Sequence, residues 1–151
     1  MTATNLYPEL EKYIRGLIGR YENIPEKRKI DLKKISEFIS NRINEGEIAR
    51  LTFICTHNSR RSHMGQIWAQ TAAAYFGLPG IETFSGGTEA TAFNPNAVEA
   101  MHNAGFQIDS DGKKDNPVYT VVFADKAPPI KAFSKKFDDK TNPDTDFCAI
   151  M

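Results

Sequence analysis

The stretch from Leu51 to Gly77 constrains the fold of this 151-residue chain more than any other. It opens with a short apolar run, Leu51–Ile54, whose residue types are typical of a buried strand. A polar, basic loop follows from Cys55 to Ser62, and an alanine-rich segment, Met64–Phe76, then carries apolar residues at helical spacing. A strand, a loop and a helix in this order predict one unit of a parallel α/β sheet.

The chain after Gly77 repeats this alternation. The predicted elements are a strand at Ile81–Ser85 that closes at Gly86-Gly87, a helix from Asn94-Pro95 to Gly105, a strand at Val118–Phe123, a Lys-, Asp- and Pro-rich loop over 124–146, and a strand at Phe147–Met151. We therefore expect an α/β fold with a parallel, doubly wound sheet. Ligands of such sheets bind beyond the carboxyl ends of the strands, which is where Cys55 lies.

Residues 1–47 have a helical pattern. Apolar residues recur every three or four positions in two stretches, with Pro25 at the start of the second and Gly46 at its end. The sequence predicts two amphipathic helices in a hairpin that packs on the following domain; a partner-binding or dimerising arm is the alternative. We thus divide the chain into a helical extension, 1–47, and an α/β domain, 48–151.

The composition argues against several classes of function and location. The formal net charge is zero, so no overall field draws the chain to nucleic acid or to an anionic membrane. There is no apolar run of membrane-spanning length and no signal-peptide pattern, so we expect a cytoplasmic protein. The two cysteines, Cys55 and Cys148, lie too far apart in the sequence to indicate a disulfide framework.

The loop from Cys55 to Ser62 has the features of a phosphate-binding cradle. Its backbone N–H groups and the positive end of the following helix favour an anion and also the thiolate of Cys55. Arg61 has a planar fork that suits a tetrahedral oxyanion, and Ser62 is placed to donate a hydrogen bond to the thiolate. Asn58 is expected to brace the loop or, alternatively, to be an ordinary turn residue. The candidate catalytic residues are Cys55, Arg61 and Ser62, and the candidate substrate-binding residues are Thr56, His57, Asn58, Ser59 and Arg60.

These motifs resemble the low-molecular-weight protein tyrosine phosphatase and arsenate reductase family. The resemblance rests on Cys-x5-Arg-Ser after an apolar strand, on Ser85-Gly86-Gly87-Thr88-Glu89-Ala90 and on Phe93-Asn94-Pro95. It runs from about Leu51 to Gly105, with a weaker similarity from Asp146 onward. It implies that Cys55 attacks phosphorus and forms a cysteinyl-phosphate, while Arg61 and the loop N–H groups stabilise the charged oxygens. It implies no metal and no cofactor.

The sequence departs from the family pattern at several positions. His57 stands where glycine is usual, so some adjustment of the loop is expected, and Arg60 stands where a second cysteine is common. The Asp-Pro pair that supplies the general acid is absent. The chain stops at Met151 within a predicted strand, so we expect a C-terminally incomplete domain. Four acidic residues are either substitutes for the acid or surface charges: Asp125, Asp138, Asp139 and Asp144.

Three functions follow in order of preference. The first is a phosphatase acting on a phosphorylated protein or a small phosphoester. The second is an arsenate reductase that uses the same loop with a thiol reductant; within it, Cys148 is expected to be core filler. The third is a binding module that holds phosphate without turnover. No feature of the sequence indicates an oligomeric state.

Overall fold

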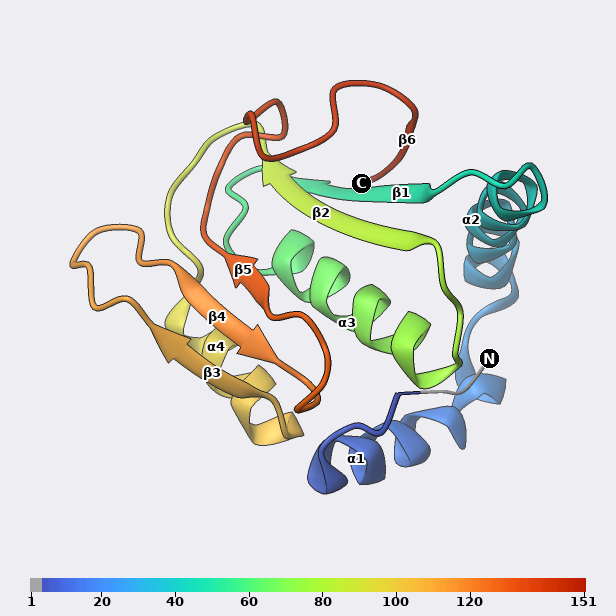
Figure 1. Cartoon of the computed structure of the whole chain (residues 1–151), viewed down its shortest axis with the longest axis horizontal. Coiled ribbons are helices and arrows are strands. Elements are labelled where there is room, and N and C mark those ends of the chain that lie inside the picture. The colour runs from blue at the N-terminus through green and yellow to red at the C-terminus, as the bar shows by residue number, and fades with distance from the viewer. Residues whose placement is uncertain (1–3) are drawn as a thin grey trace.

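A three-stranded parallel sheet lies at the centre of the fold (Figure 1), in a computed structural model that describes residues 4–151. Along the chain the elements are α1 (Pro8–Ile18), the 3-10 helix η1 (Tyr21–Asn23), α2 (Glu26–Asn44), β1 (Ala49–Cys55), α3 (Arg61–Tyr75), β2 (Ile81–Gly87), α4 (Pro95–Ala104), β3 (Gln107–Ser110), β4 (Tyr119–Val122), β5 (Ile130–Ala132) and β6 (Phe147–Ile150). The strand order of the parallel sheet is β2-β1-β6. The predicted α/β fold with a parallel sheet is therefore confirmed.

The connection from β1 through α3 to β2 sets the position of the polar loop. β1 and β2 are parallel and in register, with Cys55 opposite Gly87 at their carboxyl ends. α3 packs along both strands (Figure 1), and Ile67 and Ala73 on its inner face are buried. The loop between β1 and α3 consequently sits at the carboxyl edge of the sheet, as expected for this topology.

The Val118–Phe123 segment differs from its prediction as a strand of the parallel sheet. It forms β4, which pairs antiparallel with β3 and β5 in a second sheet. Only residues 111–118 separate β3 from β4, and a parallel connection needs a dozen residues or more. The predicted loop over 124–146 also contains β5. The third parallel strand is instead β6, at the predicted C-terminal strand.

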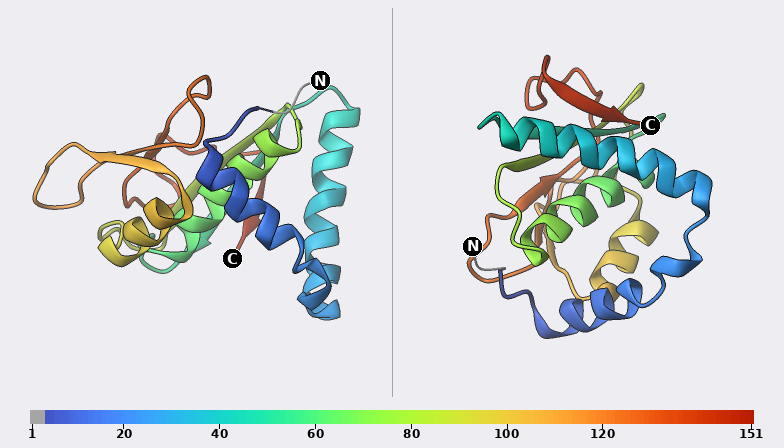
Figure 2. Two further views of the ribbon diagram at one scale, coloured as in Figure 1. Left: turned by 90° about the horizontal axis from the view of Figure 1, so that it is seen from below. Right: turned by 90° about the vertical axis from the view of Figure 1, so that its right-hand side faces the viewer.

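The two predicted N-terminal helices are present but do not pack as a hairpin. Leu10 and Ile14 of α1 are buried in the same core as Met101 of α4. α2 has no buried residue and lies beside the beginning of β1, at the end of the sheet opposite Cys55 (Figures 1 and 2). The two helices diverge from η1 and contact different parts of the domain. The division of the chain at residue 47 stays a prediction.

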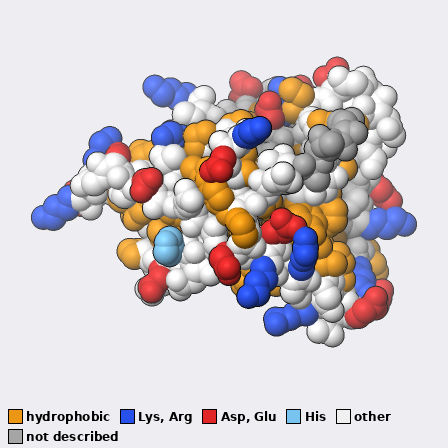
Figure 3. Space-filling view, turned by 60° about the horizontal axis from the view of Figure 1, so that its bottom comes forward, with side chains coloured by type: hydrophobic (Ala, Val, Ile, Leu, Met, Phe, Trp, Pro, Cys, Tyr) orange, Lys and Arg blue, Asp and Glu red, His pale blue; other side chains and the backbone are white. Residues whose placement is uncertain are grey.

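The surface carries charges of both signs, interspersed with apolar side chains (Figure 3). Exposed aromatic and aliphatic residues include Tyr13 and Leu17 of α1 and Ile30 of α2. Within residues 4–151, no helix combines the length and the apolar character needed to cross a membrane.

Candidate active site

The loop of residues 56–60 turns its carbonyl groups outward. The carbonyls of Cys55 and Thr56 accept from the N–H groups of Thr88 and Glu89, at 3.1 and 2.8 Å, and that of Ser59 accepts from Asn94 at 2.8 Å. In the described part of the chain, the N–H groups of residues 56–60 have no oxygen or nitrogen acceptor. Successive free N–H groups on the inside of a loop form an anion-binding concavity.

Three side chains below the loop form a hydrogen-bonded chain with a defined direction. The Asn58 amide Nδ2 donates to Ser62 Oγ at 2.7 Å, and Ser62 Oγ lies 3.0 Å from Cys55 Sγ. Because an amide nitrogen is only a donor, the Ser62 oxygen accepts from it and the Ser62 hydroxyl proton remains available for the sulfur. Ser62 is therefore oriented toward the thiolate of Cys55.

Opposing effects act on the pKa of Cys55. Partial burial raises the pKa, whereas hydrogen bonds from the Ser62 hydroxyl and from the backbone N–H groups of Ser62, Ser59 and Asn58 lower it. The hydrogen bonds together outweigh burial, so the net pKa is below the ordinary thiol value. The N-terminal end of α3, which begins at Arg61, adds a positive potential. The site thus favours the thiolate, the nucleophilic form of cysteine.

Asn58 connects the loop to a segment 77 residues away. Its side chain is fully buried, and its Oδ1 accepts from the Lys135 N–H at 2.9 Å. Its backbone is left-handed, with φ +45°, a conformation that asparagine tolerates better than most residues. Nearby, the Ser134 hydroxyl donates to the His57 carbonyl at 2.9 Å and accepts from the Thr91 N–H at 2.8 Å.

Glycine is required where β2 ends beside the loop. A Cβ on Gly87 would lie 2.7 Å from the Asn58 nitrogen, and one on Gly86 would lie 2.3 Å from the Cα of Phe137. Both distances are shorter than any normal contact, and backbone atoms cannot give way as a flexible side chain does. The Gly-Gly pair therefore allows the loop, β2 and the segment after β5 to meet.

A cavity of about 310 Å³ opens above Cys55. Of the predicted site residues, Asn58 and Ser62 lie buried beneath the loop and Thr56 is exposed outside the cavity lining. Arg60 and Arg61 are exposed, and neither forms an ion pair with another described residue. The lining residues are Cys55, His57, Ser59, Arg60, Arg61 and Thr91.

His57 fits the loop without needing the backbone freedom of a glycine. The left-handed residue of the loop is Asn58, whereas His57 is not at positive φ. The His57 ring is exposed, and its Nε2 lies 3.6 Å from a carboxylate oxygen of Glu89 at the rim of the cavity.

The structure separates the four candidate acids from Cys55, since none lines its cavity. The Asp139 carboxylate accepts from the Thr141 N–H and hydroxyl, and Asp138, Asp139 and Asp144 line a different cavity. Asp125 interacts with the Tyr7 side chain. Within residues 4–151, no three His, Cys, Asp or Glu residues cluster as metal ligands.

Cys148 also lies apart from Cys55. It is opposite Leu51 in the β1–β6 pairing, four residues before Cys55 on β1, which corresponds to about 13 Å along a strand. Burial raises the pKa of its thiol. Two thiols this far apart do not form a disulfide without rearrangement of the backbone.

Several residues of the site had no sequence signal. Thr91, Ser134 and Lys135 are distant from the loop in the sequence, and folding of the chain brings them into contact with it. Ser134 and Lys135 come from a segment predicted to be irregular. His63 is buried against the Phe93 ring, at a centroid distance of 4.3 Å. Burial, with the nearby charge of Lys135, lowers the pKa of His63 to about 3, so His63 is neutral near pH 7.

Comparison with known proteins gives consistent matches to one family. The chain matches the family model described as low molecular weight phosphotyrosine protein phosphatase over residues 50–125. An arsenate reductase of Brevibacillus brevis is 44% identical over 63 residues, which are 42% of this chain and 43% of the relative. An arsenate reductase of Bacillus subtilis is 45% identical over 56 residues, or 37% of each chain. One from Staphylococcus aureus strain Newman is 41% identical over 56 residues, or 37% of this chain and 40% of the relative.

The match therefore spans less than half the length of these curated relatives. No solved structure matches the chain.

Proposed function

Because the chain belongs to the low molecular weight phosphotyrosine protein phosphatase family, we propose that it is a cysteine-dependent phosphatase with Cys55 as its nucleophile. The proposed substrates are phosphomonoesters of the phosphotyrosine class. The observation that carries the proposal is the directed chain from Asn58 through Ser62 to the Cys55 sulfur, beneath a loop with inward N–H groups.

The proposed reaction has two displacement steps. The Cys55 thiolate attacks phosphorus, a sulfur–phosphorus bond forms, and the phosphorus–oxygen bond to the leaving group breaks. A water molecule then attacks phosphorus, which releases inorganic phosphate and regenerates the thiolate with the Ser62 hydroxyl as its hydrogen-bond donor. The loop N–H groups and Arg61 act on the three remaining phosphoryl oxygens, where transition-state charge is spread.

No Asp or Glu is among the residues that line the Cys55 cavity, so the proposal assigns no carboxylic acid to protonate the leaving group. General acid catalysis typically contributes about 10²–10⁴-fold, and the contribution is small for leaving groups that are stable as anions. The proposal therefore predicts a strong preference of this 151-residue chain for activated aryl phosphates over alkyl phosphates.

The second candidate is arsenate reduction, which is favoured by the names of the relatives reported above. Arsenate is tetrahedral and would occupy the same cradle. Cys55 would displace one oxygen of arsenate as water, and an external thiol would then attack the Cys55 sulfur. The electron pair of the sulfur–arsenic bond would reduce As(V) to As(III), arsenite would leave, and a mixed disulfide would remain for a second thiol to reduce.

One pair of assays separates the two chemistries. The wild-type chain and Cys55→Ser are compared for hydrolysis of p-nitrophenyl phosphate and for consumption of arsenate with excess dithiothreitol. Cys55-dependent hydrolysis without arsenate consumption supports the phosphatase, and the reverse result supports the reductase. If phosphate protects Cys55 from alkylation but neither substrate turns over, the chain is a binding module and both enzymatic proposals are wrong.

A further inference from the structure

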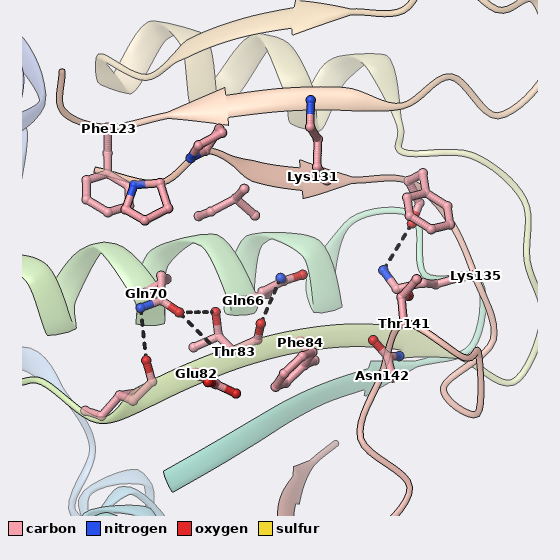
Figure 4. A pocket seen from close by; sticks show the side chains of 15 residues that line it. Gln66, Gln70, Glu82, Thr83, Phe84, Phe123, Lys131, Lys135, Thr141 and Asn142 are labelled. Atoms are coloured by element: carbon pink, nitrogen blue, oxygen red, sulfur yellow. Dashed lines mark hydrogen bonds between the residues drawn. The ribbon is translucent and has the colours of Figure 1, made fainter. Parts of the chain in front are cut away.

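A second and larger cavity, of about 550 Å³, lies between α3, β2 and the segment that contains β5 (Figure 4). Its volume falls in the range of small-molecule sites. It shares no lining residue with the cavity above Cys55. Its walls are formed by Gln66, Gln70, Ile81, Glu82, Thr83, Phe84, Phe123, Pro128, Pro129, Ile130, Lys131, Phe133, Lys135, Thr141 and Asn142.

Lys135 stands at one end of the cavity and apolar side chains at the other, with polar side chains of α3 and β2 between them. Phe123 lies at the apolar end (Figure 4), with Phe84 and Ile130 along the walls. Glu82 also lines the cavity and is paired with Arg50, at 3.5 Å. The amide nitrogen of Gln66 is occupied in a hydrogen bond to the Thr83 carbonyl of β2. Gln70 is occupied in the same way, through bonds to the Ile81 carbonyl and the Thr83 N–H.

Lys135 is a buried cation with no carboxylate in direct contact. Its residue is 6% exposed, and no carboxylate of the described residues lies within ion-pair distance of its ammonium. Burial lowers the pKa of Lys135 to about 8, and the Asp139 carboxylate, beyond ion-pair distance, acts in the opposite direction. The ammonium has one hydrogen bond, a long one of 3.5 Å to the Phe133 carbonyl, and stands 4.6 Å from the centre of the Phe133 ring. An ammonium has three donors, and a buried charge is costly unless it is paired.

We propose that this cavity binds a small aromatic carboxylate, whose carboxylate pairs with Lys135 and whose ring lies between Phe84, Phe123 and Ile130. The charge of Lys135 at one end and the apolar side chains of Phe123 and Ile130 in the walls match the two halves of such a molecule. Burial of both halves together would compensate the lysine and remove apolar surface from water. The proposal does not rest on the reaction at Cys55, although the backbone N–H of Lys135 also bonds to Asn58 of the loop.

The test uses isothermal titration calorimetry with 2-naphthoate and its neutral isostere 2-naphthamide. Wild-type protein is expected to bind one naphthoate at least tenfold more tightly than the amide, and saturating inorganic phosphate should leave this binding unchanged. Equal affinities, no naphthoate binding, or displacement by phosphate would each overturn the proposal, the last because it would place the carboxylate in the loop of Cys55.

Two lysine variants test whether naphthoate binds in this cavity. Lys135→Met keeps a side chain of similar length without the charge and is expected to abolish the preference for naphthoate. Lys131→Met is the matched control, because Lys131 lines the same cavity but its Nζ is bonded to Thr120 Oγ1 at 2.7 Å; its affinity should match wild type. Retained preference in Lys135→Met contradicts the proposal.

A measurement on wild-type protein alone covers the case in which Lys135→Met does not fold. Naphthoate is expected to shift the NMR resonances of Phe84, Phe123 and Lys135. Shifts confined to the loop of residues 55–61 would instead overturn the assignment.

Discussion

Cys55 shows how hydrogen bonds outweigh burial at a single residue. Burial alone would raise its pKa, yet Ser62 and the loop N–H groups reverse the direction of the shift. The Asn58 amide determines which way the Ser62 hydroxyl points, so the effect depends on three side chains rather than on the cysteine alone.

The Ser62 hydroxyl is predicted to lower the pKa of Cys55. Ser62→Ala removes the donor 3.0 Å from Sγ, so the pH midpoint for alkylation of Cys55 by iodoacetamide should rise. Ser59→Ala is the matched control: it makes the same chemical change but keeps the backbone N–H that acts on the sulfur. An unchanged midpoint in Ser62→Ala, or an equal rise in both variants, would contradict the proposed role.

The buried His63 is predicted to make the fold sensitive to acid. Its pKa is about 3 in the folded protein and about 6.5 when unfolded, so between these values only the unfolded state gains the proton. The free energy of unfolding should therefore fall as pH decreases from 6.5 toward 3, by about 1.4 kcal/mol per unit from this group.

Denaturant titrations of His63→Gln at several pH values check this prediction. The variant should lose this part of the pH slope, whereas His102→Gln, at an exposed position of α4, should retain it. Identical slopes for wild type and His63→Gln would show that His63 takes up its proton in the folded state.

At the scale of elements, α3 protects the free edge of β2. Gln70 and Gln66 bond to the backbone groups of Thr83, and Gln70 also bonds to the Ile81 carbonyl. Unpaired edge groups are templates for association with another strand. α3 thus covers one face of the sheet and also forms hydrogen bonds with backbone groups at the edge of β2.

Gln70→Ala is predicted to weaken the fold and expose this edge. Loss of the amide leaves the Thr83 N–H and the Ile81 carbonyl without partners, at a cost of about 1–3 kcal/mol in unfolding free energy. Light scattering should also show more self-association than for Gln107→Ala, a control on the exposed face of β3. Equal stability and scattering in the two variants would contradict the protective role.

The elements of the βα units were predictable because each has a local signal. α4 begins after Asn94, whose side chain accepts from the Asn96 N–H, and ends at Gly105 with φ +116°, as the sequence pattern indicated. The sheet to which Val118–Phe123 belongs was not predictable, since an apolar run does not specify its partner strand. The Asn58–Lys135 contact, across 77 residues, likewise has no local pattern.

At the scale of the whole molecule, the proposed active site and α2 lie at opposite ends of the parallel sheet. The proposed anion-binding loop lies at the carboxyl end of β1, and α2 lies at the opposite end (Figure 1). α1 belongs to the core, because Leu10 and Ile14, together with Leu6 just before the helix, are buried with residues of α4 and β4. α1 therefore contributes to stability through the core, and no residue of α1 or α2 lines the Cys55 cavity.

Leu10→Ala is predicted to destabilise the domain by about 2–5 kcal/mol, because Leu10 is fully buried in the shared core. Ile30→Ala in α2 should change stability by less than about 0.5 kcal/mol, since Ile30 is 60% exposed. Thermal unfolding of both variants measures the difference. Equal effects would mean that α1 does not contribute to the core as described.

The most direct test of the proposed function is to trap the covalent intermediate. Wild-type protein is mixed with p-nitrophenyl phosphate and quenched in acid, and its intact mass and peptides are measured by mass spectrometry. The proposed mechanism predicts one added phosphoryl group on Cys55, accompanied by p-nitrophenol release, and neither in Cys55→Ser. Turnover that persists in Cys55→Ser, or a phosphoryl group on another residue, would contradict the assignment of Cys55 as the nucleophile.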